Sequence, residues 1–169
     1  IPLICGSIMS KKIAEGISGL VLDIKVGSGT FMKSIDQAKE LGSWMKKIGN
    51  LFDIKTDIIF TNMNQPLGRY AGLLCEVEES INALKGDGCQ DLMNVVIKLA
   101  NKALKLTNII NPEKKIFSVI NNGSALDTFY KMVSLHGGKT RNLKPNYKYN
   151  KSIKSKSNGI LNYTDIIAR

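Results

Sequence analysis

The chain has 169 residues, 43% of them hydrophobic, and carries a net charge of +10 at pH 7. This length and hydrophobic content suffice for a globular domain with a core and exclude a wholly disordered chain. We find no basic, apolar leader and no apolar run long enough to span a bilayer, so a cytoplasmic location is expected. Three cysteines without metal-type spacing argue against a disulfide framework.

The chain opens with a predicted helix and a predicted strand. Residues 7–15 have a helical pattern that begins near Ser7 and stops at Gly16. Residues 19–26 are an apolar run, typical of a buried strand in a parallel sheet. Ser7 and Lys11 share one helix face, where a hydroxyl and an ammonium can bind the carbonyl groups of a heterocycle or clamp a phosphate. Solvated surface side chains are the alternative interpretation of this pair.

A second helix and strand follow. Ser34 and Gln37 have the spacing of a capping box, and apolar residues recur at helical intervals over residues 35–49. Residues 56–61, with the short apolar run Ile58-Ile59-Phe60 at their centre, are predicted to form the next strand. Strand, helix and strand at this spacing predict one crossover unit of a parallel sheet.

The rest of the chain is predicted to be helical up to a basic segment. Helices are expected at residues 71–85, 88–106, 113–121 and 124–135, and a further strand from Gly159. Residues 139–156 contain seven basic and no acidic side chains; the remainder has 17 basic and 14 acidic ones, a net charge of +3. We interpret residues 139–158 as a solvated linker, with a nucleic-acid-binding patch as the alternative.

A glycine-rich turn, Gly27-Ser28-Gly29-Thr30, follows the first strand. It can expose backbone N–H groups to an anion, and a plain tight turn explains it equally well. It matches neither the phosphate loop of nucleoside triphosphatases nor the dinucleotide fingerprint. Asp23 and Lys25 lie on one side of the strand near its carboxyl end, where they either belong to a site or form an ion pair that shapes the loop.

Several motifs in register resemble thymidine phosphorylases and pyrimidine-nucleoside phosphorylases. They are Ser7-Ile8-Met9-Ser10-Lys11-Lys12, Leu22-Asp23-Ile24-Lys25-Val26-Gly27-Ser28-Gly29, Met63-Asn64-Gln65-Pro66-Leu67-Gly68 and Leu84-Lys85-Gly86. The resemblance implies reversible phosphorolysis, in which phosphate attacks the anomeric carbon of a pyrimidine (deoxy)nucleoside. The products are the free base and a (deoxy)ribose 1-phosphate. Phosphate is then a co-substrate, and no organic cofactor is expected.

The resemblance also implies an α/β fold with a parallel or mixed sheet flanked by helices, truncated at both ends. Residues 1–16 would be the last helix of a small all-α domain and residues 17–138 the large α/β domain. Residues 139–158 would be the basic linker and 159–169 the start of the C-terminal part of the α/β domain. Substrates would bind between the two domains of a homodimer. The family's phosphate-binding residues and active-site histidine would lie upstream of Ile1, so the chain is expected to be a fragment that is inactive alone.

By position, Ser7 and Lys11 match the serine and lysine that hydrogen-bond the pyrimidine base in this family. Lys11 would stabilise the leaving base, because negative charge develops on it as the glycosidic bond breaks. Leu67, Tyr70 and Glu79 match positions that ligate a monovalent cation such as K⁺, the first two through backbone carbonyls. Four positions depart from the family pattern, namely Asn62, Tyr70, Leu73 and Lys139.

Alternatives remain at this point. Anthranilate phosphoribosyltransferase shares the fold, but its diphosphate-binding and magnesium motifs are not visible here. The non-enzymatic alternatives are a basic nucleic-acid-binding module built on residues 139–156 and an inactive remnant. The motifs do not distinguish a thymidine from a uridine substrate.

Overall fold

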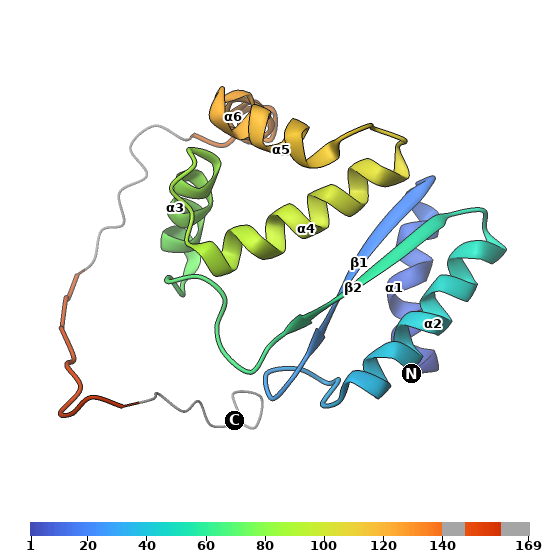
Figure 1. Ribbon diagram of the computed structural model, residues 1–169, viewed down its shortest axis with the longest axis horizontal. Helices are drawn as coiled ribbons and strands as arrows, with labels where there is room; N and C mark the ends of the chain where they lie inside the picture. Colours follow the sequence, from blue (N-terminus) through green and yellow to red (C-terminus); the bar gives the residue numbers. More distant parts are fainter. Residues whose placement is uncertain (140–147, 160–169) are drawn as a thin grey trace.

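The computed structural model describes residues 1–139 and 148–159, and these form an α/β arrangement (Figure 1). Strand β1 (Gly19–Val26) pairs in parallel with β2 (Lys55–Asn62), in a register that sets Gly19 opposite Lys55 and Val26 opposite Asn62. The helices of the described residues are α1 (Pro2–Ala14), α2 (Ile35–Leu51), α3 (Leu73–Leu84), α4 (Gln90–Leu106), α5 (Pro112–Asn121) and α6 (Ser124–Leu135). The expected parallel α/β fold is confirmed.

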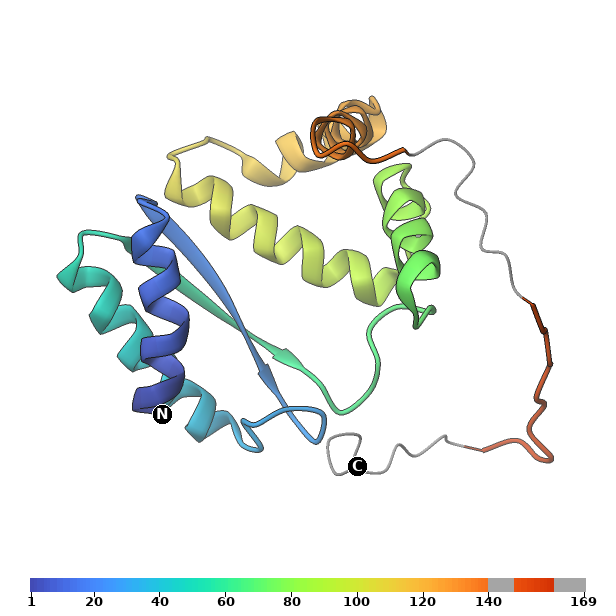
Figure 2. The ribbon, with the colours of Figure 1, turned by 180° about the vertical axis from the view of Figure 1, so that it is seen from behind.

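Helices α1 and α2 lie together on one face of the two strands, as both views show (Figures 1 and 2). Side chains from both helices and from β1 meet there in one apolar core. Its buried members are Cys5, Met9, Ile24, Met32, Ala38, Leu41 and Met45. Because a strand alternates its side chains, the odd-numbered residues of β1 are left for the opposite face.

Helix α4 covers that opposite face (Figure 1). Its Lys102 Nζ lies 2.6 Å from Asp57 Oδ2 on β2, and a Cβ on Gly19 would lie 3.6 Å from the Leu106 side chain. Helix α5 packs on α4, and α6 contacts α5 and α3. The sheet is therefore a layer between two sets of helices.

The start of α2 is set by the predicted capping box. The Gln37 N–H donates to Ser34 Oγ at 3.3 Å, and the Ser34 N–H donates to Gln37 Oε1 at 3.4 Å. These bonds satisfy backbone donors that the first turn of a helix leaves without intrahelical acceptors. The prediction for this helix is confirmed, and both strands fall within one residue of their expected bounds.

The predicted start of the first helix is wrong. Helix α1 begins at Pro2, so Ser7 lies in its middle. Proline suits the first helical position because its φ is already helical and its missing N–H would have no intrahelical acceptor there. The predicted stop is confirmed, since Gly16 takes the left-handed conformation, with φ of 66°.

Apolar residues recur along one side of α4 and are only partly buried. They are Leu92, Val95, Val96, Leu99, Ala103 and Leu104. None of the α4 residues is fully buried, and Val96 is exposed. The physical reason is the width of the sheet. In the described part of the chain the sheet has two strands, and a sheet of that width does not cover the whole apolar side of α4.

Two predictions lie wholly or partly outside the described residues. They are the strand that follows Gly159 and residues 140–147 of the basic linker. Lys139 and residues 148–158, which the structure does describe, contain no helix or strand and are exposed. The boundary after residue 16, between a small α domain and the large α/β domain, stays a prediction. In the structure α1 shares one apolar core with α2 and β1.

Candidate active site

A cavity of about 190 Å³ lies beside β1, between α1 and the turn that follows the strand. One wall is Ile4 and Ile8 of α1, and the facing wall includes Thr30 and Phe31 of the turn. The carboxyl half of β1 and two core residues of α2 complete it. Ligand sites of parallel α/β sheets lie at this end of the strands. We call this cavity the β1 pocket.

Ser7 and Lys11 do not line the β1 pocket themselves. Each lies three residues, about one helical turn, after a residue of α1 that does: Ser7 after Ile4, and Lys11 after Ile8. Both side chains are exposed, and neither has a hydrogen-bond partner among the described residues. A hydroxyl and an ammonium thus lie one helical turn from two residues of the pocket wall.

The turn after β1 is not an open anion site. All four of its N–H groups donate within the protein: Gly27 to the Met32 carbonyl, Ser28 to Asn64 Oδ1, Gly29 to the Met63 carbonyl and Thr30 to the Gly27 carbonyl. A bound anion would have to displace one of these acceptors. The tight-turn interpretation is therefore the one that the structure favours.

Asp23 and Lys25 form an ion pair that also includes Thr61 of β2. Lys25 Nζ lies 2.5 Å from Asp23 Oδ2 and 3.0 Å from Thr61 Oγ1, and Thr61 donates to Asp23 Oδ1 at 2.6 Å. Lys25 stands opposite Thr61 in the register, so the group ties the ends of both strands together. Of the two interpretations left open, this contact favours the structural ion pair.

Glu79 is a buried carboxylate on α3, only 9% exposed. Its Oε1 accepts a hydrogen bond from the Arg69 N–H at 2.7 Å and lies 3.7 Å from Cys89 Sγ. Arg69 stands between Leu67 and Tyr70, so this bond draws the loop with both candidate carbonyl ligands toward the carboxylate. A carboxylate together with backbone carbonyl oxygens is the kind of ligand set that hard cations take in proteins, and the cation site stays a prediction.

The thiol of Cys89 adjoins this carboxylate. Its hydrogen bond with Asp91, its partial desolvation and the charge of Glu79 together raise the pKa of Cys89. The same bond to Cys89, with the N–H groups of Leu92 and Gly68, lowers the pKa of Asp91. Across the described residues, no group of three or more His, Cys, Asp or Glu side chains could hold a metal ion, so any cation here depends on carbonyls.

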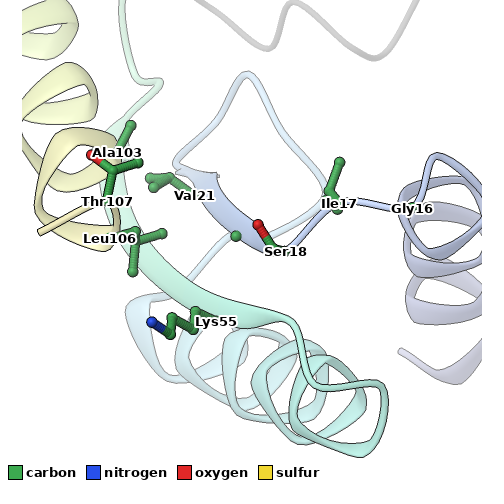
Figure 3. A pocket seen from close by; sticks show the side chains of 9 residues that line it. Gly16, Ile17, Ser18, Val21, Lys55, Ala103, Leu106 and Thr107 are labelled. Atoms are coloured by element: carbon green, nitrogen blue, oxygen red, sulfur yellow. The ribbon is translucent and has the colours of Figure 1, made fainter.

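A larger cavity, about 510 Å³, lies at the opposite, amino-terminal end of the strands (Figure 3). It is lined by residues 16–19 and Val21, with Lys55 of β2 and three residues near the end of α4. No residue of α1 lines it. We place the candidate site at the smaller β1 pocket, because two residues of its wall, Ile4 and Ile8, lie one helical turn from the polar pair predicted from the sequence.

Sequence reasoning missed the apolar walls of the β1 pocket and the part played by Thr61. Ile4 and Ile8 could have been found from their helical spacing to Ser7 and Lys11. Thr61 could not, because its contact depends on the strand register.

Fold and site together define a parallel α/β protein with its candidate site at the carboxyl half of β1. Residues 2–126 match the family described as "Glycosyl transferase family, a/b domain". The chain therefore belongs to this glycosyl transferase family.

Named relatives agree with the motif-based resemblance and confirm it. The chain is 37% identical over 168 residues to the thymidine phosphorylase of Mycobacterium tuberculosis, in an alignment that covers 99% of the chain and 39% of that protein. It is 42% identical over 142 residues to the pyrimidine-nucleoside phosphorylase of Staphylococcus aureus, covering 82% of the chain and 33% of the relative. It is 39% identical over 177 residues to the pyrimidine-nucleoside phosphorylase of Staphylococcus epidermidis, in an alignment that covers 99% of the chain and 40% of that protein.

The chain thus spans about two fifths or less of the length of these relatives. Nothing in the comparisons supports the alternative of a basic nucleic-acid-binding module. No helix in the described part of the chain combines the length and the apolar character that crossing a membrane requires.

Proposed function

We propose that this chain is the base-binding part of a pyrimidine-nucleoside phosphorylase. The observation that carries the proposal is the exposed hydroxyl and ammonium pair of Ser7 and Lys11, one helical turn from residues that line the β1 pocket. The named relatives of the chain are thymidine and pyrimidine-nucleoside phosphorylases. The whole protein would convert a pyrimidine (deoxy)nucleoside and phosphate to the free base and a (deoxy)ribose 1-phosphate.

The chemistry assigned to Lys11 follows from the charge of the leaving group. As the bond between the anomeric carbon and the base breaks, negative charge develops on the base and its carbonyl oxygens. An ammonium donor at such an oxygen binds the transition state more strongly than the neutral nucleoside, and this difference lowers the barrier. Ser7, one turn earlier on α1, would orient the base through its hydroxyl. Closure of the two domains would then bring phosphate and nucleoside together.

Further features belong to the same proposal. Phosphate acts as co-substrate, and a monovalent cation such as K⁺ binds Glu79 and the carbonyls of Leu67 and Tyr70. The hydrogen bond from the Arg69 N–H to Glu79 supports that cation site, because it holds the loop that carries Leu67 and Tyr70 next to the carboxylate. The protein works as a cytoplasmic homodimer, without an organic cofactor.

The test is phosphorolysis of thymidine and uridine by the full-length protein that contains these residues. Lys11→Ala should lower kcat/KM by about 10²–10³-fold, in the range for loss of one donor to a developing charge. Lys12→Ala is the matched control, because Lys12 is the next residue and pairs with Glu15 at 2.9 Å on the helix surface. We expect it to leave kcat/KM unchanged.

Two outcomes would contradict the proposal. Equal effects of Lys11→Ala and Lys12→Ala would remove Lys11 from the mechanism. A folded full-length protein that releases no base from either nucleoside, with phosphate present, would favour the inactive remnant.

A further inference from the structure

The turn after β1 is held from outside by the loop after β2. The Ser28 N–H donates to Asn64 Oδ1 at 2.8 Å, and the Gly29 N–H donates to the Met63 carbonyl at 2.9 Å. The Met63 N–H in turn donates to the Val26 carbonyl at 2.7 Å. Half of the N–H groups of the turn therefore depend on a loop that lies 36 residues away in the sequence.

Asn64 is the side chain that makes this contact. Its own N–H donates to Asn62 Oδ1 at 3.0 Å, which fixes the backbone that carries the amide. On the other side, Gly27 has φ of 137°, and a Cβ there would come within 2.5 Å of Asn64 Oδ1. The close approach needs both a glycine in the turn and a short side chain with an acceptor in the loop.

This turn supports one wall of the β1 pocket. Thr30, the last residue of the turn, and Phe31, the next residue, line the same cavity as Ile4 and Ile8 of α1. Phe31 is 80% exposed, so packing of its own ring does not determine where it lies. The backbone on its two sides sets the position of this wall: the turn before Phe31, and Met32 after it, which is buried in the main core.

We propose that Asn64 is a positioning residue for the pyrimidine base: it acts through the Ser28 N–H to set the wall of the pocket that faces Ile4 and Ile8. This inference rests on the proposed function for the identity of the ligand, a pyrimidine base. The effect of Asn64 on the turn does not rest on that function, so the positioning role and the proposed function can fail separately.

The first measurement follows amide hydrogen exchange in this chain. Asn64→Ala removes the acceptor and should speed exchange at Ser28 by about tenfold, as expected for loss of one net hydrogen bond. Exchange at Ile24 and Ile59, in the core of the strands, should not change. Asn64→Asp keeps an acceptor oxygen and should restore protection. Gln65→Ala, at the neighbouring exposed amide, is the control.

The second measurement is steady-state phosphorolysis by the full-length protein. Asn64→Ala should raise KM for the nucleoside by about tenfold, since one hydrogen bond of this kind corresponds to about that factor. KM for phosphate should not change, and Asn64→Asp should restore the nucleoside KM. A merely structural role would lower thermal stability and would not separate the two KM values.

Three results would overturn the inference. One is unchanged exchange at Ser28 in Asn64→Ala. Another is faster exchange together with an unchanged KM for the nucleoside, which would show a positioned turn that does not serve the base. The last is a wild-type protein with no phosphorolysis: the proposed function then fails and the role toward the base fails with it, while exchange at Ser28 still reports the geometry.

Discussion

At the scale of single residues, the glycines of this chain differ in what surrounds them. Gly27 has a backbone conformation that other residues rarely adopt, and Asn64 occupies the space that a side chain would need. Gly6, in the middle of α1, has no atom within 4 Å of its virtual Cβ. Gly27 is required by the close approach of Asn64, whereas Gly6 makes no such contact and only weakens its helix.

This difference predicts opposite effects of the same substitution. Gly27→Ala should lower the free energy of unfolding by about 1–3 kcal/mol, from backbone strain and the clash with Asn64. Gly6→Ala should raise it by about 0.5–1 kcal/mol, because alanine loses less conformational entropy in a helix. Urea unfolding of the two variants checks both signs. A stabilising Gly27→Ala would contradict the geometry of the turn.

At the scale of elements, α4 is joined to β2 by one ion pair. Asp57 and Lys102 are each about one-third exposed, at 33% and 36% of the side chain. Partial burial acts to raise the pKa of Asp57, but the hydrogen bond and charge of Lys102, with the Ile58 N–H, outweigh it and lower the pKa below its usual value. The pair therefore stabilises the folded state while Asp57 is ionised.

The stabilisation from this pair should depend on pH. A depressed pKa contributes stability above the unfolded value of about 3.9, and this contribution is lost as pH falls through the lower folded value. Lys102→Met should cost about 0.5–1 kcal/mol at pH 7, the range for a partly exposed pair. The difference from the wild type should shrink at about pH 3 and below.

Urea unfolding at several pH values measures this dependence. Lys98→Met is the matched control, since Lys98 lies one turn earlier on α4 and has no ion pair within the described residues. A cost for Lys102→Met that stays the same at every pH would assign its effect to packing.

At the scale of the whole molecule, the main core joins α1 to β1 and α2. Met9 of α1 and Met45 of α2 are 1% and 2% exposed and belong to the same cluster as Ile24 of β1. The structure thus gives α1 two roles: one side in the core, the adjoining side bearing Ser7 and Lys11.

Truncation of the core methionines should therefore destabilise the molecule as one unit. Met9→Ala and Met45→Ala should each cost about 2–5 kcal/mol, as expected for buried large-to-small changes. Met132→Ala, at an exposed position on α6, should stay within about 0.5 kcal/mol. Fluorescence of Trp44, the single tryptophan, reports on α2, and circular dichroism reports on all helices. If Met9→Ala moved the circular dichroism transition and not the fluorescence transition, α1 would be a separate unit.

Elements that local chemistry specifies can be predicted from the amino-acid sequence alone. The capping box of Ser34 and Gln37, the stop at Gly16 and the apolar runs of both strands each depend on residues close together in the chain. The motifs were also sufficient for the family, because several short segments agree in order and spacing over a long stretch.

Contacts between segments that are distant in the chain could be found only from the folded structure. The register that sets Lys25 beside Thr61, the acceptor that Asn64 supplies to the turn, and the burial of α1 against α2 all depend on how elements pack. Local patterns give each element its faces but do not specify which partner a face meets. For the same reason the sequence predicted Ser7 and Lys11 as a pair, whereas the pocket beside them emerged only when helix, strand and turn were brought together.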